Sequence, residues 1–418
     1  MKDIESTRKE FLENLTLTED QGATLFSLFS GKNIFLSGEP GTGKTFLLET
    51  YIMMQRELGR GVAITATTGI AAVNLDPCAR TIHSLLRFIP DFKGEYDYEK
   101  CCKELTANHT LIIDEVSMLT PDIASHLAKC LHTIEREHWP QIVVCGDFHQ
   151  LPPVIKEPQK KVYAFELPFW KELDLQPMIL HQVVRQQDPV FIDHLRRIRN
   201  GDPFAVRYFN ECANKEFLEQ GVILCTKNVT ASRYNRRAME ALPGEEKSYR
   251  LEKEIEGIPN LKDFPFDPVI RLKVGMKVMT LVNNYEKGYR NGSIGVVKEM
   301  HDRMIVVEFS NGLCVEIERV SQSVQNMDPK SKNEVMIVNQ FPLRAAYAIT
   351  IHKSQGLTFE NVNIDAPDCW DYGQLYVALS RAKSISGIHL MDPIRQSCVR
   401  TSPRVLTFYQ TLEKQVAA

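Results

Sequence analysis

The chain has 418 residues, of which 43% are hydrophobic and 25% charged, and its formal net charge is −3. This length exceeds one ordinary hydrophobic core, so we expect two or three domains. The slightly acidic balance excludes a protein that coats nucleic acid through bulk positive charge. Any nucleic-acid site must therefore be a local groove.

The N-terminal stretch, residues 1–15, alternates charged with apolar residues and lacks the apolar core of a signal peptide. No apolar run in the sequence is long enough to span a bilayer. We therefore expect no membrane contact and an intracellular protein, cytoplasmic in a prokaryote and nuclear or mitochondrial in a eukaryote.

The ten cysteines are scattered, apart from the adjacent pair Cys101 and Cys102. The sequence contains no C-x-x-C and no Cys/His spacing typical of a zinc site. We predict reduced, mostly buried thiols, as is usual in an intracellular chain.

From about residue 33 to residue 169, short β-branched runs alternate with amphipathic stretches. Continuous apolar runs between helices are typical of strands that are buried on both faces of a parallel sheet. We therefore predict a doubly wound α/β domain over residues 1–177. Its predicted strands are 33–37, 61–65, 110–114 and 141–145.

A second α/β domain is predicted over 178–248 and 343–418, with a strand at 222–226 and a helix at 228–242. Between these two pieces, residues 249–342 form short apolar runs that are separated by turn residues, including Asn291-Gly292 and Asn311-Gly312. This pattern indicates a small all-β module inserted into the second domain.

A phosphate-binding loop follows the first predicted strand. Residues 38–45, GEPGTGKT, fit G-x-x-x-x-G-K-[ST] between a strand and a helix. Backbone amides of such a loop surround the β-phosphate at a helix N-terminus, a lysine neutralises the β/γ oxygens, and a hydroxyl ligates Mg²⁺. The residues predicted to bind ATP are Gly38, Pro40, Gly41, Thr42, Gly43, Lys44 and Thr45, and Thr45 is also a predicted Mg²⁺ ligand.

The predicted strand 110–114 ends in paired carboxylates, the Walker B form. Asp114 would hold Mg²⁺ through water, and Glu115 would orient or deprotonate the attacking water. Alone, such a pair is more often a solvated strand end, but a preceding phosphate loop reverses this preference. Gln150, after the next strand, is predicted to sense the γ-phosphate; the alternative is a loop glutamine that caps backbone groups.

Further motifs extend through both predicted α/β domains. They are 17–21 (LTEDQ), 65–72 (TATTGIAA), 81–84 (TIHS), 146–154 (GDFHQLPPV), 180–186 (LHQVVRQ), 348–358 (AITIHKSQGLT) and 376–382 (YVALSRA). With the phosphate loop, these residues resemble the petite-integration-frequency (Pif) family of DNA helicases. That family belongs to the 5′-to-3′ branch of helicase superfamily one, beside RecD-like and Dda-like enzymes.

The resemblance implies two RecA-like domains with parallel sheets, an SH3-like barrel at 249–342 and a short wedge insertion at about 87–105. It implies that Gln21 reads adenine, that Arg185 and Arg381 contact the γ-phosphate, and that Gly356 lies in the nucleotide site. The arginines also make physical sense, because an arginine supplied by a second domain can accelerate phosphoryl transfer by about 10³–10⁵.

Hydroxyl, imidazole and amine groups gather in one cluster per α/β domain. Such groups bind phosphate and sugar without reading sequence, and two clusters favour a single strand lying across both domains. The residues predicted to contact DNA are Thr65, Thr67, Thr68, His83, Phe88, Thr350, His352, Lys353 and Ser354. For any one polar residue the alternative is a helix cap, and for Phe88 it is local packing.

The predicted function is an ATP-dependent 5′-to-3′ helicase, monomeric in solution, that unwinds duplex or structured DNA at forks. The resemblance implies work in DNA repair, recombination, telomere maintenance or on G-quadruplexes. An alternative is a RecD-like motor or ATP-gated DNA-binding subunit of a larger complex. A phosphate-loop kinase or protein-remodelling ATPase would have no use for the cluster at 352–356.

Overall fold

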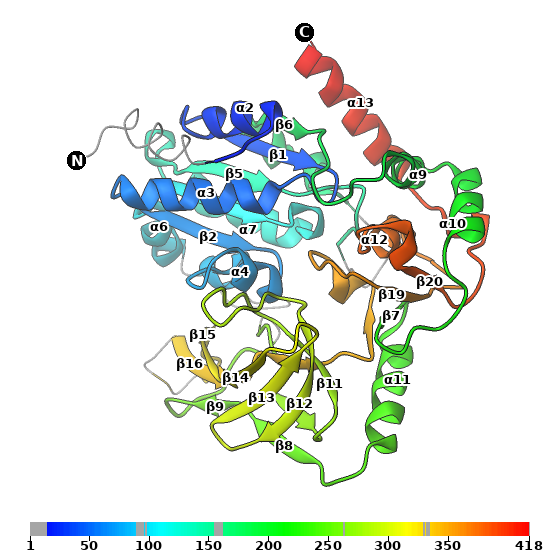
Figure 1. Cartoon of the computed structure of the whole chain (residues 1–418). Coiled ribbons are helices and arrows are strands. Elements are labelled where there is room, and N and C mark those ends of the chain that lie inside the picture. The colour runs from blue at the N-terminus through cyan, green and yellow to red at the C-terminus, as the bar shows by residue number, and fades with distance from the viewer. Residues whose placement is uncertain are drawn as a thin grey trace. The chain divides into compact units, whose positions relative to one another are not determined.

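The computed structural model describes residues 15–88, 96, 98–153, 162–261, 264–328, 331 and 335–417 (Figure 1). The chain divides into two compact units. The first comprises Met1–Gln187 and Ser402–Ala418, and the second comprises Asp188–Thr401. No helix among the described residues has the length and apolarity needed to cross a membrane.

The first unit is built on a six-stranded sheet in the order β3-β2-β4-β5-β1-β6, with every pairing parallel. This confirms the predicted parallel α/β domain. The strands are β1 (Ile34–Gly38), β2 (Val62–Ala66), β3 (Arg80–Thr81), β4 (Thr110–Asp114), β5 (Gln141–Cys145) and β6 (Gln176–Leu180). The helices are α2 (Glu19–Leu28), α3 (Lys44–Glu57), α4 (Gly69–Leu75), α5 (Ile82–Leu85), α6 (Tyr98–Thr106), α7 (Pro121–His132), α8 (Pro168–Glu172) and α13 (Pro403–Ala417).

Both faces of this sheet are covered, which explains the continuous apolar runs. Successive residues of β4 enter different apolar clusters. Leu111 and Ile113 pack with α6, α7 and α13, whereas Ile112 packs with α2, α3 and α4. Because side chains alternate across a strand, the two clusters lie on opposite faces. The carboxyl ends of β1, β4 and β5 meet at one edge, where the predicted ATP site would lie.

The predicted boundary at residue 177 is wrong. β6 continues the first sheet, because Ile34 to Gly38 of β1 pair in parallel with Gln176 to Leu180. The first unit therefore extends to Gln187, and Arg185 belongs to the same unit as the phosphate loop.

The C-terminal helix was also predicted in the wrong domain. α13 packs on the first unit, where Val405, Tyr409 and Leu412 are buried in the cluster that covers one face of the sheet. Phe408 stacks on Phe165 with ring centroids 4.1 Å apart. These aromatic contacts hold the C-terminal segment on the first unit, although it follows the second unit in the sequence.

The second unit contains a parallel four-stranded sheet in the order β18-β7-β19-β20. Its strands are β7 (Val222–Cys225), β18 (Ala348–Thr350), β19 (Val362–Asp365) and β20 (Ile388–Leu390). The helices are α9 (Pro189–Arg199), α10 (Val206–Cys212), α11 (Asn228–Ala241) and α12 (Gln374–Leu379). β7 and α11 match the predicted strand and helix to within one residue.

The predicted all-β insertion is present in the second unit. It comprises the antiparallel sheet β14-β13-β12-β11-β17, the sheet β15-β16-β9 and the pair β10-β8. The strands are β8 (Lys247–Arg250), β9 (Glu252–Lys253), β10 (Val269–Leu272), β11 (Lys277–Thr280), β12 (Ile294–Met300), β13 (Met304–Phe309), β14 (Cys314–Glu318), β15 (Val320–Gln325), β16 (Val335–Gln340) and β17 (Leu343–Ala345). Gly312, in the β13–β14 turn, has a φ of +80°, which explains the Asn-Gly pair there. The SH3-like classification stays a prediction.

The predicted wedge at about 87–105 lies partly outside the described residues, which omit 89–95 and 97. Its C-terminal part is α6, an amphipathic helix with Cys101 and Leu105 in the core of the first unit.

Candidate nucleotide-binding and nucleic-acid sites

The phosphate loop connects β1 to α3 and is closely packed. Gly41 and Gly43 both have a φ of +87°. A Cβ atom on Gly41 would lie 2.5 Å from the Cβ of Arg185, and one on Gly43 would lie 2.6 Å from Nε2 of Gln21. Both positions therefore require glycine for conformation and for space.

Lys44 is the first residue of α3, and its ammonium group lies over the loop. Nζ donates hydrogen bonds to the carbonyl oxygens of Gly38 at 2.8 Å and Glu39 at 3.1 Å. Carbonyl oxygens are weaker partners for an ammonium than phosphate oxygens are. The Lys44 ammonium is thus held at the place where the loop would bind a phosphate.

Arg185 lies directly beside this loop. The backbone amides of Val184 and Arg185 donate to the carbonyl oxygen of Gly41 at 2.8 and 3.1 Å. Since Arg185 belongs to the first unit, its position does not depend on closure of a second domain, contrary to the prediction from the sequence.

Gln21 supports the phosphate loop through its amide. Its Nε2 donates to the carbonyl oxygen of Thr42 at 3.0 Å, and its Oε1 accepts from the backbone of Thr18 at 3.1 Å in a capping box at the start of α2. Both ends of the amide are engaged inside the protein, so reading adenine would require these bonds to be exchanged.

Asp20 anchors the chain that leads from β6 to Arg185. Its Oδ2 accepts from the backbone amides of His181 at 2.7 Å and Gln182 at 3.2 Å. Partial burial would by itself raise the pKa of Asp20. Hydrogen bonds from Thr18 and these amides outweigh burial and lower the pKa below its ordinary value.

The paired carboxylates lie at the end of β4. Burial raises the pKa of Asp114, while a hydrogen bond from the amide of Glu115 and the charge of Lys44 oppose that rise. Glu115 has the left-handed conformation, with φ 52° and ψ 42°. This conformation costs a non-glycine residue about 1–3 kcal/mol and is typical of functional positions. Thr67 supports the turn by donating from Oγ1 to the carbonyl oxygen of Glu115 at 2.9 Å.

Gln150 lies in the turn after β5, the strand between β4 and β1. Gln150 is buried, and its backbone amide donates to the carbonyl oxygen of Asp147 at 3.0 Å. The structure therefore brings Gln150 to the sheet edge that carries the phosphate loop and Asp114.

Tyr409 of α13 holds two parts of this edge together, and sequence reasoning missed it. Its hydroxyl lies 2.6 Å from Oγ of Ser37, just before the phosphate loop, and accepts from the amide of Phe148 at 3.2 Å. Its ring stacks on that of His149 at 4.8 Å. No local motif marks Tyr409, because its partners lie far away in the sequence.

A magnesium site fits the residues present at this edge. Thr45 is exposed at the start of α3, and the buried carboxyl of Asp114 lies close enough to Lys44 for the ammonium to oppose the rise in the pKa of Asp114. Hydroxyl and carboxylate oxygens are suitable ligands for Mg²⁺, which usually retains several waters.

Several residues predicted to contact DNA in the first unit have structural roles. Thr65 is buried and donates from Oγ1 to the carbonyl oxygen of Ile112 at 2.6 Å. Phe88 is buried and stacked on Tyr96, with ring centroids 5.8 Å apart. Thr68 caps α4 by accepting from the amide of Ala71. Thr67 and Thr68 are partly exposed, as is His83 on α5.

In the second unit the cluster 350–354 forms a turn between β18 and the 3₁₀ helix His352–Ser354. Oγ1 of Thr350 accepts from the amide of Lys353 at 3.3 Å, and the buried Ser354 donates to the carbonyl oxygen of Ile351 at 2.8 Å. These hydroxyls shape the turn. Gly356 follows with a φ of +78°.

Lys353 and His352 are the members of that cluster that solvent can reach. Partial desolvation of its ammonium and the nearby charge of Arg344 lower the pKa of Lys353. A bound phosphate would relieve this repulsion. The ring of His352 is inclined by 26° to that of Trp370, with centroids 6.4 Å apart, and Trp370 is 48% exposed. Trp370 was missed from the sequence, where an isolated aromatic gives no signal.

Arg381, at the end of α12, is 1% exposed. Its guanidinium donates to the carbonyl oxygens of Val377 at 2.9 Å and Leu357 at 3.0 Å, and to Oγ of Ser380 at 2.8 Å. All these partners belong to the second unit.

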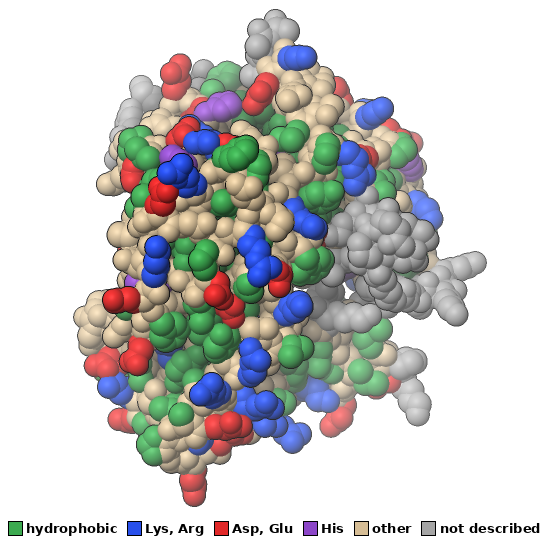
Figure 2. Space-filling view, turned by 90° about the vertical axis from the view of Figure 1, so that its right-hand side faces the viewer, with side chains coloured by type: hydrophobic (Ala, Val, Ile, Leu, Met, Phe, Trp, Pro, Cys, Tyr) green, Lys and Arg blue, Asp and Glu red, His purple; other side chains and the backbone are tan. Residues whose placement is uncertain are grey.

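Charged side chains of both signs share the face of the molecule shown in Figure 2. On the face shown in Figure 2, lysine and arginine side chains are interspersed with aspartate and glutamate, without one continuous basic surface. Since the formal net charge of the chain is −3, a nucleic-acid site on it would rely on a few local contacts.

Two family models match this chain, one in its N-terminal half and one near its C-terminus. Residues 17–205 match the family described as PIF1-like helicase, and residues 345–387 match the UvrD-like helicase C-terminal domain. The ATP-dependent DNA helicase Pif1 of Bdellovibrio bacteriovorus is 33% identical over 96% of this chain and 93% of that protein. The ATP-dependent DNA helicase PIF1 of Danio rerio is 32% identical over 96% of this chain, which spans 64% of that relative's length.

Solved structures are similar over nearly the whole chain. Pif1 from Bacteroides sp in complex with ADP-AlF4 has 29% identity and a TM-score of 0.79, covering 96% of this chain and 98% of that one. Bacteroides Pif1 bound to ssDNA has 29% identity and a TM-score of 0.71 with the same coverage. The likeness therefore includes both units and the β insertion.

Proposed function

Because this chain belongs to the PIF1-like helicase family, we propose that it is an ATP-driven helicase that moves along single-stranded DNA. The observation that carries the proposal is the sheet edge of the first unit, where Lys44, Asp114 and Arg185 surround one phosphate loop. This combination of cation, acid and arginine suits phosphoryl transfer.

In the proposed reaction, Lys44 exchanges its carbonyl partners for the β- and γ-phosphate oxygens. Glu115 orients and deprotonates the attacking water, and Gln150 monitors the γ-phosphate. Bound Mg²⁺, held by Thr45 and by Asp114 through water, would supply charge neutralisation. Arg185 stabilises the charge on the transferring phosphoryl group, and the resemblance assigns the same role to Arg381.

For DNA, the direct contacts that we propose are three imidazole or amine groups that are partly or fully exposed: His83 in the first unit, and His352 and Lys353 in the second. Trp370, beside His352, offers an aromatic face for a base, which every base can use. Thr65, Thr67, Thr350 and Ser354 support these contacts indirectly, by holding the backbone of their turns.

We propose movement from 5′ to 3′, which rests on the family resemblance, because both strand-contacting clusters would exist in a motor of either polarity. Forks and tailed duplexes are the proposed substrates, and a monomer is the proposed state in solution. Melting duplex DNA costs about 1.4 kcal/mol per base-pair step. The conformational change that ATP binding drives must therefore be coupled to each step of the motor along the strand.

A strand-displacement assay tests the proposal. Purified chain should open duplex with a 5′ single-stranded tail and leave duplex with only a 3′ tail intact, with Glu115→Gln as the inactive control. Equal opening of both substrates would contradict the direction. ATP turnover without displacement of either would instead favour the RecD-like alternative, an ATP-gated subunit of a larger complex.

A further inference from the structure

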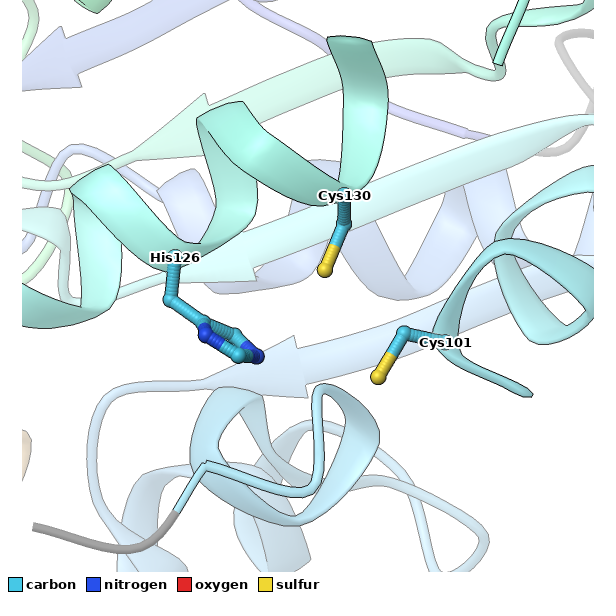
Figure 3. A group of neighbouring side chains, drawn as sticks. All are labelled: Cys101, His126 and Cys130. Carbon is cyan, nitrogen blue, oxygen red and sulfur yellow. The ribbon is translucent and has the colours of Figure 1, made fainter. Parts of the chain in front are cut away.

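Two thiols and an imidazole form a buried cluster in the first unit. Cys101 lies on α6, and His126 and Cys130 lie one turn apart on α7 (Figure 3). One donor atom from each side chain lies within 4.8 Å of the other two, and all three residues are buried. As Figure 3 shows, the three side chains point toward one another from two helices.

The carbonyl oxygen of Leu86, which follows α5, faces the same point. Sγ of Cys101 donates to it at 3.1 Å, and Nε2 of His126 also lies 3.1 Å away. The neighbouring Cys102 turns elsewhere and donates to the carbonyl oxygen of Cys130 at 3.2 Å. The cluster thus contains one backbone oxygen besides its two sulfurs and one ring.

We propose that Cys101, His126 and Cys130 bind one thiophilic divalent cation of the zinc type. Two thiolates and one imidazole are a donor set that zinc prefers, whereas Mg²⁺ and Ca²⁺ select oxygen ligands. The spacing of His126 and Cys130 places both on one face of α7. The Leu86 carbonyl or a water takes the fourth position.

A disulfide between the two cysteines is the competing use of these sulfurs, and it would not involve the imidazole. Metal binding uses all three side chains. It displaces both thiol protons to solvent and involves no change in oxidation state, so it needs no external oxidant.

The cation would attach the segment after α5 to the core. The ring of His126 packs against Phe88 at 5.3 Å and Tyr96 at 4.3 Å between centroids, and Leu86 joins them to α5, which carries His83. The proposed metal site would therefore have a structural role, holding the segment that carries His83, a proposed DNA contact. Its occupancy is measured independently of the proposed helicase activity.

The test uses the full chain, reduced, stripped with a chelator and titrated with Zn²⁺ against a colorimetric competitor. One Zn²⁺ per chain should bind, and Co²⁺ as a substitute should show thiolate-to-metal charge-transfer absorption. Cys130→Ser and His126→Ala should weaken Zn²⁺ binding by more than about 100-fold, beyond the usual loss for a group that only orients a ligand. His126→Cys should retain the metal, since it restores three donors.

The matched control is the buried thiol pair Cys369 and Cys398 in the second unit, which forms no three-donor group with another described residue. Cys398→Ser should leave Zn²⁺ binding unchanged. The proposal fails if wild type binds no Zn²⁺, if Cys130→Ser binds as wild type does, or if Cys398→Ser abolishes binding. It also fails if intact mass shows two hydrogens lost and a disulfide in place of the metal. Where a serine variant does not fold, the Co²⁺ spectra of wild type and His126→Cys decide.

Discussion

Lys44 and Glu115 are single residues with separable tasks, charge neutralisation and water activation. Lys44→Ala should abolish ATP turnover. Glu115→Gln should keep Mg²⁺-ATP bound while turnover falls by about 10²–10⁴-fold, the usual effect of losing a general base. Steady-state turnover and equilibrium binding of a fluorescent nucleotide measure the two effects. Turnover of Glu115→Gln within tenfold of wild type would remove Glu115 from this role.

The two arginines should act on the transition state. Replacing Arg185 or Arg381 by Ala should lower kcat by about 10²-fold or more, with a much smaller loss of ATP affinity. Since Arg381 is buried and hydrogen-bonded, its variant also needs a thermal melt, whereas Arg185→Lys is the charge-conserving control for the other site. A loss confined to KM would contradict both assignments.

Gly41 offers a test of packing at the phosphate loop. The Cβ of an alanine there would lie 2.5 Å from the Cβ of Arg185, and the φ of +87° is unfavourable for any residue with a side chain. Gly41→Ala should therefore raise the KM for ATP and lower the melting temperature. Gly59→Ala is the control, because Gly59 has a φ of +68° with nothing within 4 Å of the new Cβ. The control should show only the backbone cost, about 1 kcal/mol. Equal effects would show that contact with Arg185 is unimportant.

How well single residues could be predicted depended on whether their partners were local. Lys44 and Asp114 follow from contiguous motifs, and the structure brings them to one edge. Thr65 and Phe88 share the motif region but turn inward, because a motif does not state which way a side chain faces. Cys101 lies beside His126 and Cys130 only because α6 packs on α7, which the sequence does not show.

At the scale of elements, α13 should stabilise the first unit through one hydroxyl. Tyr409→Phe removes the partner of Ser37 and of the buried Phe148 amide, so it should lower the free energy of unfolding by about 1–3 kcal/mol. Tyr285→Phe, on an exposed side chain, is the control and should change it little. Chemical denaturation followed by circular dichroism measures both. Equal losses would refute the role of the Tyr409 hydroxyl.

Elements with a strong local pattern were predicted well. The domain to which an element belongs was predicted less well, as β6 and α13 show. The buried runs at β4 and β5 and the alternating strands of the insertion carry their own periodicity. β6 and α13 have ordinary helix or strand patterns too. Their membership of the first unit depends on pairing with β1 and on aromatic stacking, which are non-local.

For the whole molecule, the slightly acidic net charge of −3 predicts a modest effect of salt on DNA binding. Single-stranded DNA should accelerate ATP hydrolysis, and log K for its binding should fall with log salt at about −0.7 per phosphate neutralised. Few basic contacts imply a shallow total slope. Lys353→Ala should reduce that slope by a fraction of a unit and leave ATP binding unchanged. A slope near zero, or equal stimulation by blunt duplex, would contradict a single-strand groove.

The interrupted first unit has a consequence for synthesis in the cell. Residues up to Gln187 leave the ribosome well before Val405, Tyr409 and Leu412, which complete one face of the same sheet. At about 5–20 residues per second, translation of the intervening second unit takes roughly 10–40 s. Throughout that interval the nascent first unit presents aromatic surface around Phe165 and Trp170 that α13 later covers. The nascent chain should therefore depend on chaperones until α13 has left the ribosome and covers this surface.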